Sequence, residues 1–205
     1  MTYTACGTPG VPQAVAHVDY DLETVPTLRG QLLVAGPTLL DPNFARTVLL
    51  VVEHDDEGAM GLVLNRPSPI PAEQAVPELG DALAPDERLW MGGPVQTTSV
   101  VVVADFPDAD ADALRVRGDV GIVLPDSDLD EIGASVRRAR AFLGYAGWGP
   151  GQLDAELDRD DWIVADFLEP DAFTDDPDHL WGTVLGRKGG PYALLATMPP
   201  DPSVN

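Results

Sequence analysis

Cysteine and long apolar runs are scarce in this 205-residue chain. A single cysteine, Cys6, rules out an internal disulfide and fits a reducing compartment. The longest apolar runs, "VLLVV" and "VVVVA", fall far short of the ~20 residues of a membrane-spanning helix. The first residues lack the basic start and apolar stretch of a secretory signal. We therefore expect a soluble, cytoplasmic protein with no membrane partner.

Basic residues are also few, because 12 Lys and Arg face 34 Asp and Glu, for a net charge of −22. DNA binding depends on Lys and Arg that neutralise phosphates, so a chain this acidic repels a duplex unless its arginines gather on one face. The densest basic cluster is "RRAR" at 137–140, which we expect on a helix, in solvent and paired with nearby aspartates. Nucleic acid is accordingly an unlikely partner.

The length and 44% hydrophobic content suit one globular domain. Residues 1–26 carry Gly, Pro and polar residues without sustained periodicity and are predicted to form a flexible N-terminal arm. The domain itself is predicted to span residues 27–198, followed by a short tail at 199–205.

Strand patterns dominate the first half of the domain. The strongest is a β-hairpin, in which β-rich Val48–His54 and Met60–Asn65 flank the turn residues "DDEG". Further strands are expected at 30–37, 88–94, 97–106, 120–124 and 162–167, and a weak helix at 71–83.

Helix patterns dominate the second half. Apolar residues at helical spacing predict a helix within 125–143, capped by Asp126 or Ser127, and a strand at 141–147 as the chain leaves it. Short helices are expected at 151–160, 176–190 and 191–199. Regular βαβ alternation is missing. The pattern therefore predicts an α+β fold, a single compact domain with a mainly antiparallel sheet and helices packed on it.

Four glycines, a proline and a tryptophan crowd the segment from Phe142 to Leu153. It fails the dinucleotide fingerprint, because Gln152 stands where the third glycine is required, and it lacks the Gly-Lys-Ser/Thr of a phosphate loop. Two interpretations stay open. The N–H groups at 151–153 could hold an anion at a helix start, or the glycines could only allow the chain to turn.

Residues for metal or nucleophilic chemistry do not cluster. His17, His54 and His179 share no short spacing, and no serine lies in Gly-x-Ser-x-Gly. The acidic loop near Asp108 matches some calcium-ligand positions, but Ala113 stands where an EF-hand needs glycine. No metal, cofactor or catalytic residue is predicted.

Several motifs in a fixed order closely resemble the YqgE/AlgH family over about residues 28–185. They are "DPNF" before the hairpin, "GLVLNRP" after it, "LWMGGPVQ", and "GWGPGQL". The resemblance implies a small bacterial cytosolic protein with a compact α+β fold. Many members carry a transcriptional-regulator label inherited from a genetic link to alginate control. The family has no established biochemical activity and no agreed catalytic residues to transfer to this chain.

Three function hypotheses follow. The preferred one is a binding or regulatory protein, not an enzyme, that acts through a protein or a small anionic ligand. If three turns converge, its ligand site would be formed by Asn65, Arg66, Gly92, Gly93, Trp148, Gly151, Gln152 and Glu156. The second is an enzyme on a small anionic substrate, with Glu53, His54 or Glu156 as acid or base. The third is a DNA-binding regulator, for which neither a helix-turn-helix nor a basic strip is visible.

Overall fold

The computed structural model describes residues 27–108 and 113–199. The arm at 1–26 and most of the acidic loop after Asp108 therefore lie outside the described residues, as does the tail from residue 200. Within the described ranges, no helix is long and apolar enough to span a bilayer.

A strongly curled sheet of ten strands organises the molecule, in the order β10-β1-β2-β3-β9-β6-β8-β7, with β5 beside β9 and β4 beside β5. All pairs are antiparallel except β5 with β9. The strands are β1 (Gln31–Ala35), β2 (Val48–Asp55), β3 (Gly58–Val63), β4 (Pro67–Pro71), β5 (Arg88–Met91), β6 (Val95–Asp105), β7 (Ala113–Arg117), β8 (Val120–Val123), β9 (Arg138–Trp148) and β10 (Trp162–Asp166).

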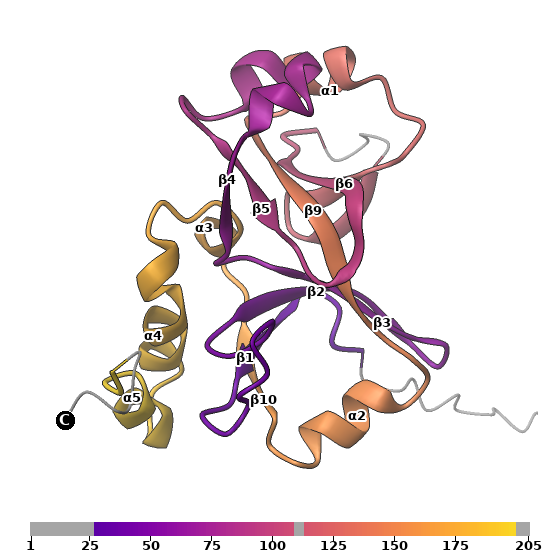
Figure 1. Ribbon diagram of the computed structural model, residues 1–205. Helices are drawn as coiled ribbons and strands as arrows, with labels where there is room; N and C mark the ends of the chain where they lie inside the picture. The colour runs from indigo at the N-terminus through magenta and orange to yellow at the C-terminus, as the bar shows by residue number, and fades with distance from the viewer. Residues whose placement is uncertain (1–26, 109–112, 200–205) are drawn as a thin grey trace, which may run out of the picture.

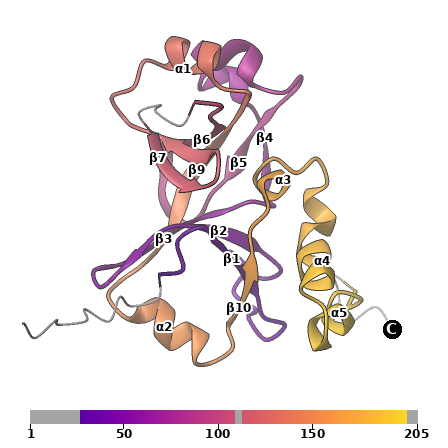
Figure 2. The same cartoon turned by 180° about the vertical axis from the view of Figure 1, so that it is seen from behind.

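The helices pack on the sheet, as Figures 1 and 2 show: α4 and α5 lie beside the β1 and β10 half, and α1 lies over the other half. They are α1 (Leu129–Ser135), α2 (Gln152–Leu157), α3 (Glu169–Ala172), α4 (Pro177–Lys188) and α5 (Pro191–Leu195), with 3₁₀ turns at Ala72–Gln74 and Pro77–Ala82. The predicted α+β domain with a mainly antiparallel sheet is confirmed.

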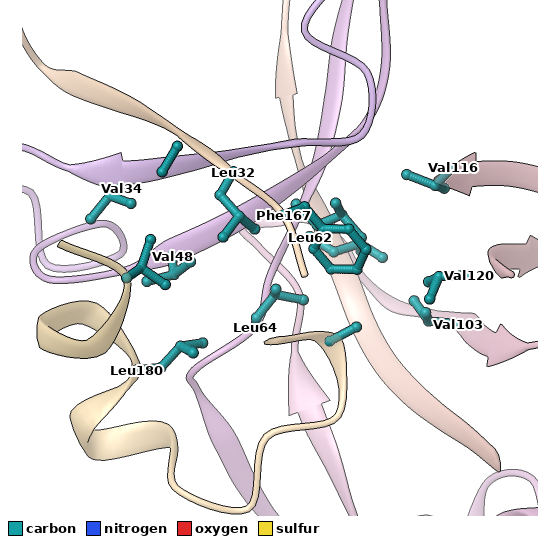
Figure 3. Close-up of a cluster of buried hydrophobic side chains, with 14 of the residues drawn as sticks. Leu32, Val34, Val48, Leu62, Leu64, Val103, Val116, Val120, Phe167 and Leu180 are labelled. Atoms are coloured by element: carbon teal, nitrogen blue, oxygen red, sulfur yellow. The ribbon is translucent and has the colours of Figure 1, made fainter. Parts of the chain in front are cut away.

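The predicted hairpin is present as β2 and β3, joined through Asp56 and Glu57. The Asp55 carboxylate accepts hydrogen bonds from the backbone N–H groups of Glu57 (2.9 Å) and Gly58 (3.2 Å), which fixes the turn. Leu50 and Leu62 pair across it and are fully buried, in the apolar cluster of Figure 3.

The predicted helix at 125–143 is wrong over most of its length. Only Leu129–Ser135 is helical, and it is capped by Asp128, whose carboxylate accepts from the N–H groups of Asp130 and Glu131. From Arg138 the chain forms β9, which pairs with β6 over seven residues and with β5 on its other side. Arg and Ala favour helices locally, but pairing between distant strands outweighs that preference.

Strand β9 holds the two halves of the sheet together. Its first residues pair with β6 and β5, and its last ones, Ala146 to Trp148, pair with β3. Figure 1 shows β9 running from the upper strands down to β3. The glycine-rich segment that stood out in the sequence is thus mostly strand, and its corner begins only after Trp148.

Candidate functional site

The first two predicted turns do lie side by side. The backbone N–H of Met91 donates to the carbonyl of Arg66 (2.7 Å), and the N–H of Val63 donates to the carbonyl of Gly92 (2.9 Å). The Gly92 N–H in turn reaches the carbonyl of Leu143 on β9 (2.8 Å). This corner joins the end of β3 to β5 and β9.

The polar side chains of this corner form hydrogen bonds with backbone groups. The buried Asn65 amide accepts from the Val48 N–H (3.0 Å) and donates to the Arg46 carbonyl (2.9 Å). The Arg66 guanidinium donates to the carbonyl of Ala45 (2.6 Å). Both residues therefore fasten the loop before β2, and this supplies a structural reason for the "LNRP" motif.

Gly92 and Gly93 are required by close packing. A Cβ at Gly92 would overlap the Gly144 carbonyl oxygen, and one at Gly93 would overlap the backbone of Tyr145. The pair lets the chain turn directly against β9.

The third turn forms a closed polar network around Glu156. One carboxylate oxygen accepts the indole N–H groups of Trp148 and Trp162, each at 2.8 Å, and the other accepts from the Gln152 amide (2.9 Å). The Gln152 amide oxygen accepts the Gly149 N–H (3.1 Å). The predicted shared face of Gln152 and Glu156 is confirmed, but the two groups bond each other and the tryptophans.

Gly151 caps the short helix α2 in the left-handed conformation, with φ of 67°. The N–H of Gln152 is already bonded to the Gly149 carbonyl (3.0 Å). The left-handed conformation at Gly151 requires the conformational freedom of glycine, while anion binding by the N–H groups at 151–153 stays a prediction.

The structure does not bring all three turns together, which corrects the expected convergence. Trp148 pairs with Ala59, near the tip of the β2–β3 hairpin, whereas Asn65 lies beyond the opposite end of β3. The eight predicted site residues therefore divide into a corner around Gly92 and a tryptophan network around Glu156. Their role in ligand binding stays a prediction.

The candidate acid–base residues are not arranged as a catalytic pair. The His54 side chain is 5% exposed, and its Nδ1 accepts the backbone N–H of Leu28 (3.1 Å). Its Nε2 lies 3.9 Å from a carboxylate oxygen of Asp154. Glu53 is exposed, and Glu156 is held by the indoles. His54 therefore anchors the chain just before β1.

The basic cluster "RRAR" comprises Arg137, directly before β9, and the first three residues of β9, and its arginines form ion pairs with carboxylates. Arg137 bonds the carboxylates of Asp105 (2.6 Å) and Asp119 (2.9 Å), and these hydrogen bonds raise its pKa. Arg138 bonds Glu169 (2.7 Å). The predicted pairing with aspartates is confirmed, but on a strand and its approach, not a helix.

Arg140 is buried, with a side chain 4% exposed. Its Nε lies 3.3 Å from a carboxylate oxygen of Glu87, its Nη1 donates to the Thr174 carbonyl (3.0 Å), and its guanidinium lies 4.1 Å from the Trp90 ring centre. Burial lowers its pKa, and the charge of Glu87 opposes that shift. Such a cation ties β9 to the strands and loop around it and is unavailable to a ligand.

None of the eight predicted site residues lines either of the two cavities described next. One, of about 1040 Å³, lies between the 3₁₀ turns and β5 and is walled by prolines and carboxylates. The other, of about 560 Å³, lies between β10 and α4; we call it the β10–α4 groove. It is lined by Thr27, Leu28, Gln31, Val164, Ala165, Asp166, Leu168, Val184, Arg187 and Lys188.

The groove has two cations among its described residues: Arg187, which is held in an ion pair, and Lys188, which is not. Arg187 forms a two-pronged ion pair with Asp171 (3.0 and 2.7 Å) and also donates to the Asp166 carbonyl (2.9 Å). Lys188 has no ion pair among the described residues, and its ammonium lies 5.0 Å from the Tyr192 ring centre. The sequence assigned Arg187 and Lys188 only to a helix end; no local signal placed them beside β10.

Over the described ranges, no group of three or more His, Cys, Asp or Glu is positioned to hold a metal ion. Asp110 and Asp112 of the calcium comparison lie outside the described residues.

The fold and its sites define a class of protein: a single α+β domain built on a curled antiparallel sheet, with polar networks that brace the sheet. A family model described as AlgH-like matches residues 32–193, and the chain belongs to this family. It is 40% identical over 187 residues to a UPF0301 protein from Streptomyces coelicolor, covering 88% of this chain and 97% of that one.

Two solved structures share the fold. A protein from Corynebacterium diphtheriae matches with a TM-score of 0.75 and 32% identity, over 82% of this chain and 91% of that one. The AlgH protein from Pseudomonas aeruginosa, solved in solution, matches with a TM-score of 0.65 and 33% identity, over 85% and 96%. The family resemblance seen in the motifs is confirmed.

Proposed function

We propose that this chain is a binding or regulatory protein that acts through a protein or a small anionic ligand and does not bind DNA directly. The observation that carries the proposal is that the arginines are already paired within the fold. The densest basic cluster, Arg137, Arg138 and Arg140, forms ion pairs with carboxylates of the same chain.

Most of the other arginines are also engaged within the fold. Arg159 and Arg187 pair with carboxylates, and a further group donates to backbone carbonyls: Arg29, Arg46, Arg66, Arg115 and Arg117. Phosphate contacts would have to compete with these partners under a net charge of −22. This arrangement supports a partner other than nucleic acid.

The β10–α4 groove is the best-supported place for a small anion. It combines a cation without an ion pair, Lys188, with apolar surface from Val164 and the exposed Leu168. Ligand sites typically combine apolar walls with a few polar groups that fix orientation.

A thermal-shift screen tests the proposal, with inorganic phosphate, nucleotides, sugar phosphates and small carboxylates as probes. A ligand at a hundredfold excess over its dissociation constant adds about 2.7 kcal/mol to the stability of the folded state. We expect at least one anionic class to raise Tm, and Lys188→Ala to remove that shift. Arg88→Ala is the matched control, because Arg88 lines the other cavity. A flat screen, or a shift that Lys188→Ala leaves intact, would count against the groove.

A further inference from the structure

The β10–α4 groove lies where the described chain begins. Thr27 and Leu28, the first described residues, line it directly. Thr27 donates to the His54 carbonyl (3.0 Å) and the Leu28 N–H to the His54 ring (3.1 Å), so this starting point is fixed. The described chain therefore begins at the rim of the groove, and the 26 residues that precede it in the sequence have ample length to span the groove.

One side of the groove is an open strand edge. β10 pairs with β1 and with no other described strand, and Val164, Ala165 and Asp166 line the groove. Leu168, just beyond β10, is 47% exposed. An exposed edge with apolar residues beside it is a template for an added extended segment.

The segment just before Thr27 has the matching pattern. In "HVDYDLETV", residues 17–25, apolar Val18, Tyr20 and Leu22 alternate with acidic Asp19, Asp21 and Glu23. An extended chain of this kind presents an apolar face and an acidic face. The first 26 residues hold these three acids and no Lys or Arg.

We propose that residues 18–23 of this chain bind in the β10–α4 groove, with the apolar face against Val164 and the exposed Leu168 and the acidic residues at Lys188. The charge complementarity depends mainly on Lys188, because Arg187 is already held by Asp171 and Asp166 adds a negative charge at the groove. An anionic ligand at Lys188 would compete with the segment. The proposal goes beyond the proposed function, because it requires no external ligand.

The test uses the full chain with a nitroxide at position 17, introduced by His17→Cys in a Cys6→Ser background. Position 17 is ten residues before Thr27, and a flexible tether of that length spans roughly 17 Å, so broadening indicates binding only where Lys188→Glu removes it. We expect selective broadening of the amide resonances of Val164, Leu168 and Val184. Lys188→Glu should abolish this broadening, and Asp21→Lys combined with Lys188→Glu should restore it.

Arg88→Glu is the matched control, since it reverses an exposed charge outside the groove and should leave the broadening unchanged. Wild-type spectra without broadening at these amides, or broadening that survives Lys188→Glu, would overturn the proposal. Neither result bears on the ligand screen, because no ligand is added. The double variant separates charge from fold damage: it carries the same Lys188→Glu change, so restored broadening shows that the single variant lost a charge contact and not its fold.

Discussion

The Glu156 carboxylate accepts the indole N–H of Trp148 at 2.8 Å, and the same oxygen accepts that of Trp162. The two indole rings meet edge to face with centres 6.1 Å apart. One carboxylate on a six-residue helix thus fixes the end of β9 against the start of β10. This network gives Trp148 and Gln152 of the Gly-Trp-x-x-Gly-Gln-Leu signature a structural role.

Replacing Glu156 should therefore destabilise the fold. Glu156→Ala leaves two largely buried indole N–H groups without an acceptor, and we expect a loss of about 2–4 kcal/mol in the free energy of unfolding. Glu156→Gln keeps an acceptor oxygen and should lose less. Urea unfolding followed by tryptophan fluorescence measures both. Asp158→Ala, an exposed change at the end of the same helix, should stay within about 0.5 kcal/mol. Equal losses for Glu156→Ala and Asp158→Ala would refute the network.

The glycine pair gives a second prediction. Gly93→Ala forces a Cβ into the Tyr145 backbone, which cannot give way without moving β9, so we expect a loss of more than about 3 kcal/mol. Gly186→Ala is the control: that glycine lies inside α4 with open space around its Cβ position. It should gain up to about 1 kcal/mol from helix propensity. Similar effects for the two substitutions, measured by thermal unfolding, would contradict the packing role.

The buried Arg140–Glu87 pair predicts non-additivity. Arg140→Met or Glu87→Gln alone disrupts the charge pairing, and we expect each to cost about 3–5 kcal/mol in unfolding free energy. The double variant removes both charges and should cost clearly less than the sum of the two. A double-mutant cycle from urea titrations measures the coupling. Additive losses would show that the two side chains act independently.

His179 at the start of α4 gives a pH prediction. Its Nδ1 lies 2.8 Å from the Asp176 carboxylate, and this hydrogen bond is the main cause of its raised pKa. The imidazolium form is thereby favoured in the folded chain, so its stabilisation is present below the unfolded pKa and is lost as pH rises through the folded pKa. An NMR titration should show His179 above the ordinary value of about 6.5 and Asp176→Asn returning it toward that value. A pKa unaffected by Asp176→Asn would contradict the assignment.

The sequence predicted those elements whose turn or end residues determine them locally. The hairpin followed from the turn residues around Asp55, and α4 from its glycine end. Only the second half of β9 was predicted, as the strand at 141–147. Its first half could not be found this way, because Arg138 to Ala141 favour a helix locally and become a strand only through pairing with β6 and β5. Strand β4 begins and ends with proline, which argues against strands away from sheet edges.

The candidate site was predictable in part for the same reason. The motifs around Gly92 and Trp148 were visible, but their purpose depends on neighbours distant in sequence, such as Tyr145 beside Gly93 and Trp162 beside Glu156. The β10–α4 groove joins residues near 28, 165 and 187, and no spacing rule connects them.

The central claim is that this protein acts through a partner other than DNA, since its arginines are spent within the fold. A titration of the full chain with fluorescent duplex DNA at about 50 mM salt, where phosphate contacts are strong, tests it most directly. We predict that the fluorescence anisotropy of the duplex stays constant as the protein concentration is raised. Saturable binding that weakens steeply as salt is raised, and that is lost on replacing Arg137 and Arg138, would contradict the account.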